Sequence, residues 1–155
     1  MLSEEILYQL LDIMPVARLG LLDGVGLPEA MPIVFARVSD GLFSPIDGKP
    51  KSSAKLARIK LIENQPKGTL LLDHYHDNWE QLWWVKMDIE ATVISMEHNL
   101  WDQAVSGLRA KYPQYHSVSL FKDNPTMIGV RWTRVRWWAS NELKGIKRWI
   151  ETRVV

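Results

Sequence analysis

The sequence lacks several features by which common classes of protein are recognised. None of its 155 residues is cysteine, which excludes disulfides, thiolate nucleophiles and cysteine metal sites. The formal net charge of +1 gives no overall field that would favour nucleic acid or an anionic membrane. No segment has the features of a signal peptide, and no apolar run reaches the length of a bilayer span. We therefore expect one soluble, cytoplasmic domain over residues 1–155, with no nucleic-acid or membrane partner.

Motifs for catalysis by the protein's own side chains are also missing. The sequence has no G-x-x-x-x-G-K-[ST] phosphate loop and no G-x-S-x-G nucleophile elbow, and no pair of carboxylates stands out for acid–base work. If the protein is an enzyme, a bound cofactor must therefore supply the reactive group. The sequence predicts no catalytic residue.

Apolar stretches separated by turn residues predict a mostly β protein with peripheral helices. Six strands are expected, over residues 16–22, 29–38, 69–75, 81–94 and 126–138 and in a short run that begins at Leu42. Helices are expected at 3–14, after residue 53, at 97–111 and at 140–151. The helices are inserted between strands and do not alternate with them one for one, which favours an antiparallel barrel over a parallel doubly wound sheet.

Two long strands have clear alternation. The strand expected at 81–94 should place these residues on one face: Trp83, Val85, Met87, Ile89 and Ala91. In the strand at 126–138, the same alternation places Trp132, Arg134, Arg136 and Trp138 on one side. This basic, aromatic strand could contact nucleic acid by stacking, or it could lie at a dimer interface. The eight tryptophans are more than a small core usually needs, so some should line a ligand pocket or a subunit interface.

The segment 42–63 combines a strand end, a basic loop and a helix start. The loop carries Lys49 and Lys51, and the helical pattern begins directly after Ser52 and Ser53. The first N–H groups of a helix have no internal partner and the helix dipole is positive there, so an anion is favoured. We interpret this segment as a phosphate cradle. The alternative is that one serine caps the helix and the lysines are solvated.

The run Asp73-His74-Tyr75-His76-Asp77 is the most metal-like cluster in the chain. Three convergent ligands at a useful spacing are not evident in it, and the alternative is a polar strand end. No metal site is predicted.

Four stretches of the chain resemble the pyridoxamine-phosphate-oxidase-like split-barrel family of flavin and deazaflavin binders. They are residues 17–35, 42–75, 78–93 and 131–138, and they cover most of the sequence. The succession of Asp-x-Lys-Pro-Lys, a helix, Leu-Leu-x-Asp-His-Tyr and Leu-Trp-Trp-Val is similar to one branch of that family, whose members are described as deazaflavin-dependent enzymes. The resemblance implies a six-stranded antiparallel split β-barrel that forms a homodimer with two cofactors at its interface.

The resemblance also implies the residues that would bind the cofactor. The strand at 31–34 would run along the isoalloxazine ring, residues 44–46 would lie beside the ring and ribityl chain, and the lysines of 49–51 would hold the phosphate. Two tryptophans would close the site across the dimer, and one near the end of the last long strand, Trp137 or Trp138, would wall it. The implied residues are Met31, Pro32, Ile33, Val34, Ser44, Pro45, Ile46, Lys49, Pro50, Lys51, Trp83, Trp84 and Trp137.

The sequence departs from pyridoxamine-phosphate oxidase itself. That enzyme uses arginines for the flavin phosphate and the substrate and has an Arg-x-His element near its C-terminus, whereas this chain has lysines in the loop and ends its last strand with RWWASNELK. Vitamin B6 oxidation is therefore not expected. His76 and Lys86 also differ from the branch, where an acid and an arginine are expected. We expect an oxidoreductase that uses FMN or an 8-hydroxy-5-deazaflavin on a small-molecule substrate. The alternatives are a flavin-binding carrier without turnover and a nucleic-acid-binding barrel.

Overall fold

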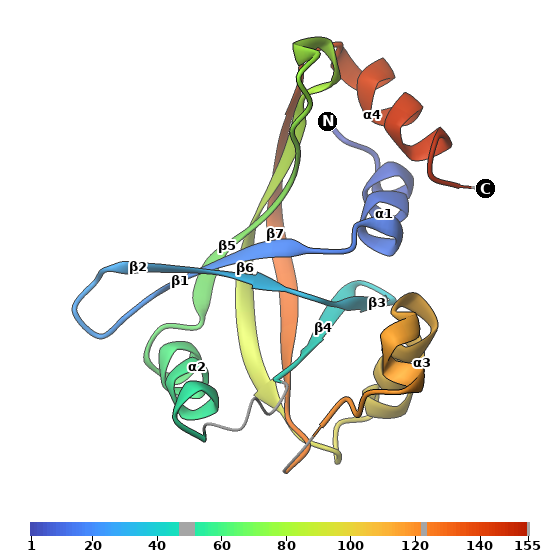
Figure 1. Cartoon of the computed structure of the whole chain (residues 1–155). Coiled ribbons are helices and arrows are strands. Elements are labelled where there is room, and N and C mark those ends of the chain that lie inside the picture. Colours follow the sequence, from blue (N-terminus) through green and yellow to red (C-terminus); the bar gives the residue numbers. More distant parts are fainter. Residues whose placement is uncertain (47–51, 122–123, 155) are drawn as a thin grey trace.

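The computed structural model describes residues 1–46, 52–121 and 124–154, and of residues 52–56 the backbone alone. Its strands form one antiparallel sheet in the order β2-β1-β5-β6-β7-β4-β3 (Figure 1). The strands are β1 (Ala17–Leu22), β2 (Pro28–Ile33), β3 (Ala36–Val38), β4 (Gly41–Pro45), β5 (Lys67–His74), β6 (Trp83–Ile94) and β7 (Met127–Ala139). The helices are α1 (Glu4–Ile13), α2 (Ser52–Asn64), α3 (Trp101–Lys111) and α4 (Glu142–Glu151), with short 3₁₀ helices η1 (Trp79–Gln81) and η2 (Pro113–His116). The predicted mostly β fold with peripheral helices is confirmed.

The described sheet has seven strands instead of the expected six, because the strand expected over 29–38 is interrupted. Its two pieces, β2 and β3, lie at opposite ends of the strand order, although only Val34 and Phe35 separate them in sequence. The three residue steps from Ile33 to Ala36 span at most about 11 Å. The two edges of the sheet must therefore approach one another, and the sheet curls toward a barrel.

The hydrogen bonds of the Phe35 backbone explain why the strand is interrupted there. The Phe35 N–H donates to the hydroxyl oxygen of Tyr112 at 3.0 Å, and the same hydroxyl lies 3.1 Å from the Phe35 carbonyl oxygen and 2.8 Å from that of Pro15. The backbone of Phe35 is thus satisfied by a side chain and does not take part in strand pairing. Burial raises the pKa of Tyr112 to about 12, which keeps the hydroxyl neutral and able to donate.

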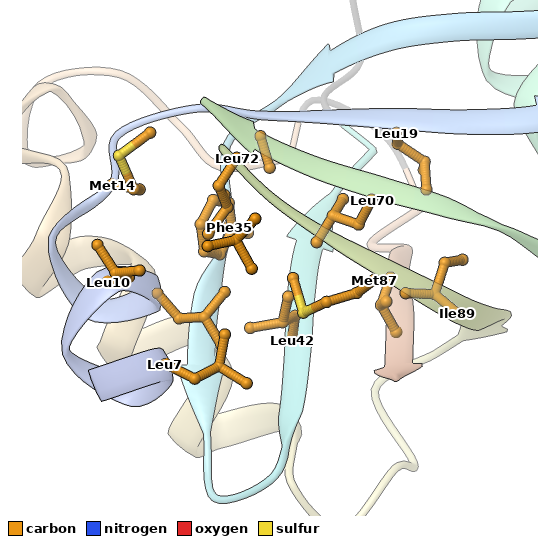
Figure 2. Packing of buried hydrophobic residues seen from close by; sticks show 14 of the residues in the cluster. Leu7, Leu10, Met14, Leu19, Phe35, Leu42, Leu70, Leu72, Met87 and Ile89 are labelled. Carbon is orange, nitrogen blue, oxygen red and sulfur yellow. The ribbon is translucent and has the colours of Figure 1, made fainter. Parts of the chain in front are cut away.

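The inner face of the curled sheet is the main hydrophobic core. The predicted inner face of β6 is confirmed, because Trp83, Val85, Met87, Ile89 and Ala91 are all buried. Figure 2 shows Met87 and Ile89 packed among leucines from the neighbouring strands and from α1. A smaller cluster forms where α3 covers β3 and β4, with Phe43, Trp101 and Leu108 at its centre.

The predicted face of β7 is wrong for one residue, Trp132. A register shift in the β6–β7 pairing follows Asp88, which pairs with Arg134, whereas the next residue, Ile89, pairs with Trp132. Thr133 is therefore the extra residue of a β-bulge, and the alternation of β7 reverses there. Trp132 packs against the core side, with its ring 6.2 Å from that of Tyr8, whereas Arg134, Arg136 and Trp138 share the outer face.

The helices α2 and α4 lie at opposite ends of the long β5–β6 hairpin (Figure 1). Ile62 of α2 is buried in the core, and α4 inserts Ile146, Trp149 and Ile150 at the other end. Over the described residues, none of the helices combines the length and the apolar character that crossing a bilayer requires.

Lys111, at the end of α3, is held beneath the β2–β3 link. Its amine donates to the carbonyl oxygen of Leu11 at 2.9 Å and lies 3.7 Å from the centre of the Phe35 ring. Burial lowers the pKa of Lys111 from 10.5 to about 7, and the carboxylate of Asp12 opposes this effect. The folded protein therefore favours the neutral amine more than the unfolded chain does.

This difference predicts how stability depends on pH. Between pH 7 and pH 10 the unfolded chain retains the Lys111 proton and the folded chain does not, so raising the pH favours the folded state. One pKa unit corresponds to about 1.4 kcal/mol. We expect the free energy of unfolding of the wild type, relative to Lys111→Met, to rise by at least about 1 kcal/mol over that range. Urea unfolding at several pH values measures it, and a constant difference between the two proteins would contradict the assignment.

Candidate functional site

The residues implied for cofactor binding fall into three groups in the structure. Residues 31–34 lie on β2 and in the link that follows it, and residues 44–46 lie at the end of β4. The tryptophans lie at the start of β6 and on the part of β7 that pairs with it. Lys49, Pro50 and Lys51 lie outside the described residues. The helix expected after this basic loop is present, and its backbone begins at Ser52.

The first group borders a groove between β2 and α2. The groove has a volume of about 650 Å³ and is lined by Ala30 and Met31 of β2 and by Arg58, Lys60 and Leu61 of α2, among others. β2 pairs only with β1, so in the described sheet its other edge has unpaired backbone groups. Pro32 is exposed, whereas the side chain of Ile33 is in the core.

The second group is buried at the end of β4. Ser44 is 2% exposed and, among the described residues, is the one fully buried polar side chain. Pro45 and Ile46 are also buried, and the Ile46 N–H donates to the carbonyl oxygen of Thr126 at 3.0 Å. This bond fixes the point at which the chain leaves the sheet and enters the basic loop.

The three tryptophans of the third group have different environments. Trp83 is 2% exposed and packs edge-on against Trp149, with the ring centres 5.0 Å apart. Trp84 is half-buried on the opposite face of the sheet, where the amine of Lys86 lies 4.8 Å from its ring centre. Trp137 is half-buried against the core side. Of the two tryptophans implied to close the site, Trp84 is the one with accessible surface.

A single chain does not bring the second and third groups together. Ser44 pairs with Ile128, which pairs with Val93 of β6, whereas Trp83 is ten residues away at the other end of that strand. At about 3.3 Å per residue, the two positions are about 33 Å apart along the strand. Both groups can therefore line one cofactor site only if they come from two chains.

The outer face of β6 and β7 carries paired charges and exposed tryptophan. Trp84 lies directly opposite Trp138 across the two strands, and Lys86 lies opposite Arg136. Asp88 accepts a hydrogen bond from Arg136 at 2.6 Å and lies 3.9 Å from Arg134. The Nε of Arg136 is buried and has no hydrogen-bond partner within the described part of the chain.

Sequence reasoning missed one further site, a polar pocket of about 430 Å³ between the end of β5 and α4. His74 and His76, which were considered as metal ligands, line it together with Arg148 and Arg153. No signal in the sequence pairs these regions, because they meet only when α4 packs on the hairpin. Over the described residues, no group of three metal-ligating side chains gathers.

Comparison with known proteins gives a match in fold. No protein-family model matches the chain, and no curated protein matches its sequence. An FAD-binding protein from Mesorhizobium loti gives a TM-score of 0.64 at 17% identity, over 88% of this chain and 94% of that one. A heme storage protein from Vibrio cholerae gives 0.62 at 13% identity, over 90% and 95%. A candidate pyridoxamine 5'-phosphate oxidase from Listeria innocua gives 0.60 at 16% identity, over 90% and 98%.

The chain has a split-barrel fold. This outcome confirms the fold class that the sequence predicts. The structures that share the split barrel carry names with different ligands, so the fold alone does not select the chemistry. The chemistry must therefore be inferred from the residues of this chain.

The different environments of Trp83 and Trp84 predict different effects on stability. Trp83→Phe should leave a cavity in the packed cluster with Trp149 and lower the free energy of unfolding by about 1–2 kcal/mol. Trp84→Phe, on the outer face, should change it by less than about 0.5 kcal/mol. Chemical unfolding of both variants measures this, and equal losses would show that Trp83 is not a core residue.

Proposed function

We propose that this split barrel is an oxidoreductase that binds FMN and transfers hydride to or from a small molecule. An 8-hydroxy-5-deazaflavin is the alternative cofactor, because both cofactors present a phosphate at the same end of the ribityl chain. The observation that carries the proposal is the groove between the free edge of β2 and α2. In the sequence, Lys49 and Lys51 directly precede the first residue of α2. Solved structures of the same fold that are described as FAD-binding and as a candidate pyridoxamine 5'-phosphate oxidase support it.

The residues of the groove fit a planar ring with hydrogen-bonding groups along one side. The free edge of β2 offers backbone groups for such bonds. A volume of about 650 Å³ is within the usual range of about 300–1,000 Å³ for small-molecule sites. Residues 31–34 would orient the ring, and the apolar side chains of Met31 and Leu61 would exclude water from one side of it.

A bound flavin or deazaflavin would supply hydride transfer at ring position 5. The chain itself would supply binding and orientation, which agrees with the absence of catalytic motifs from its sequence. Lys49 and Lys51 are assigned to the phosphate, with the first N–H groups of α2 as further donors. Ser44, Pro45 and Ile46 are assigned to the ribityl side of the site.

We propose that the functional unit is a homodimer with the cofactor at its interface. The separation of about 33 Å along β6 between the level of Ser44 and that of Trp83 supports this assembly, since Trp84 of one chain could then reach the site of the other chain. The outer face of β6 and β7 is the contact surface that we assign, because it combines the half-buried Trp84 and the exposed Trp138 with the buried Nε of Arg136, which has no partner among the described residues. Buried polar groups nearly always have a hydrogen-bond partner, and a second chain would be able to supply one here.

The phosphate assignment predicts the affinity of lysine variants for the cofactor. A charge-assisted hydrogen bond contributes about 1.5–3 kcal/mol, so Lys49→Ala or Lys51→Ala should weaken FMN binding by roughly 10- to 100-fold. Riboflavin has the same ring and no phosphate, so its affinity should fall much less. Lys147→Ala, which removes an exposed lysine of α4, is the matched control. Fluorescence titration of apoprotein measures all of these affinities.

Three outcomes, from this titration and from two companion assays, separate the alternatives. Unchanged FMN affinity in both variants would contradict the phosphate cradle. The alternative would then hold, in which a serine caps the helix and the lysines are solvated. Tight FMN binding without reduction or reoxidation of the bound ring by any of a panel of donors and acceptors would favour the carrier module over the enzyme. A colourless protein whose binding to oligonucleotides weakens steeply with salt would favour the nucleic-acid-binding barrel.

The assigned interface predicts the effect of a charge on the outer face of β7. We expect a dimer at micromolar concentration, and Trp138→Glu should convert it to a monomer by placing a carboxylate among apolar contacts. The control is Val118→Glu, since Val118 is 53% exposed and Trp138 is 45% exposed, on a different part of the surface. Light scattering reports the mass of each protein. A monomeric wild type would refute the assembly.

A further inference from the structure

The pocket at the α4 end is formed by two segments that are far apart in sequence. One wall is the end of β5 and the turn after it, with His74, His76 and Asn78, and the other is α4 and the residues after it, with Arg148 and Arg153. The floor contains aromatic rings, since His74 stacks on Trp83 at 6.3 Å and lies 5.7 Å from Trp149. With a volume of about 430 Å³, the pocket is large enough for a small molecule.

The charges that line this pocket are mainly positive. Arg148 and Arg153 carry permanent positive charge, and the rings of His74 and His76 lie beside them. Glu80 is the one carboxylate among the described residues of the lining. Neither arginine forms an ion pair in the part of the chain that the structure describes. Arg153 stacks on the ring of Trp149 at 4.1 Å, which holds its guanidinium against the pocket wall. Two guanidinium groups without carboxylate partners suit an oxyanion.

The floor of the pocket is largely buried. Burial, with smaller contributions from the positive charges of Arg153 and His76, lowers the pKa of His74, and Asp73 opposes these effects. The indole N–H of Trp149 is buried within the floor and has no hydrogen-bond partner among the described residues. The groups that the pocket offers to an anion are therefore the two guanidinium groups, with the His74 ring beside them.

We propose that this pocket is a binding site for a small molecule with an oxyanion group, a phosphate or a carboxylate, held by Arg148 and Arg153 with His74 and His76 beside it. The site is separate from the groove beside α2 that is assigned to the cofactor, because α2 and α4 lie at opposite ends of the β5–β6 hairpin (Figure 1). It therefore does not rest on the proposed flavin chemistry. The aromatic floor formed by Trp149 and His74 would contact the body of the ligand.

The site should bind anions more tightly at low pH. The charged groups around His74 are Asp73, His76, Glu80, Arg148 and Arg153. A bound anion favours the protonated form of His74, so by linkage the affinity rises as the pH falls through the pKa of that group. Sulfate is a suitable probe, because it remains a dianion throughout this range and its own charge contributes nothing to the change.

The experiment is calorimetric titration of the whole protein with sulfate and with succinate, which distinguish a tetrahedral oxyanion from a carboxylate. We expect saturable binding of at least one probe, and a loss of about tenfold for Arg148→Gln, the effect of one charge-assisted hydrogen bond. Lys147→Gln removes the same charge from the adjacent, exposed position on α4, outside the pocket lining, and should change the affinity by less than about twofold. His74→Gln should weaken the pH dependence of the affinity for sulfate.

Several results would overturn the proposal. One is the absence of saturable binding by either probe. Another is an equal loss of affinity in Arg148→Gln and Lys147→Gln, which would indicate only a general effect of charge. Loss of binding in Lys49→Ala together with retained binding in Arg148→Gln would place the anion in the phosphate cradle instead. Melting temperatures of the variants show whether each is folded, and Arg148, as an exposed residue, should be replaceable without loss of the fold.

Discussion

The structure depends on the two-residue link between β2 and β3. This link joins the two edges of one sheet, so it forces the curvature that encloses the core, and its backbone must be satisfied without a neighbouring strand. The hydroxyl of Tyr112 does this by bonding to both backbone groups of Phe35 and to the carbonyl of Pro15. Three distant segments therefore meet at one oxygen atom, and Lys111 beside it contacts the Phe35 ring and the end of α1.

The closure also determines where ligands can bind. Because β2 and β3 are the two edges, the free edge of β2 remains exposed next to α2, and the end of β4 is directed into the basic loop. The long β5–β6 hairpin projects away from this region and ends under α4 (Figure 1). The fold thus has two separate hollows, a groove beside a strand edge and a cationic pocket under α4, and these are the places to which the two proposed ligands are assigned.

The sequence predicted the elements whose periodicity was strong and local. The alternation from Trp83 to Ala91 identified the inner face of β6, and the resemblance implied the split barrel that the structure shows. The face of Trp132 was mispredicted because the bulge at Thr133 arises from pairing with β6 and leaves no local signal. The break at Phe35 was missed because its hydrogen-bond partner, Tyr112, is 77 residues away. The pocket of His74 and Arg148 was missed for the same reason, since it requires the packing of α4.

The same geometry explains why the tryptophans implied for one site have unlike environments. Along β6, successive side chains point to opposite faces, so Trp83 and Trp84 cannot both contact a ligand on one side of the sheet. Trp83 is part of the aromatic floor beneath the cationic pocket, whereas Trp84 lies beside Trp138 on the outer face. A cofactor bound by a second chain would meet the outer face, and a ligand of the pocket would lie above the inner cluster. Trp83 therefore supports the pocket from beneath, through the rings of His74 and Trp149, and Trp84 is the residue through which an assembled dimer would complete the cofactor site.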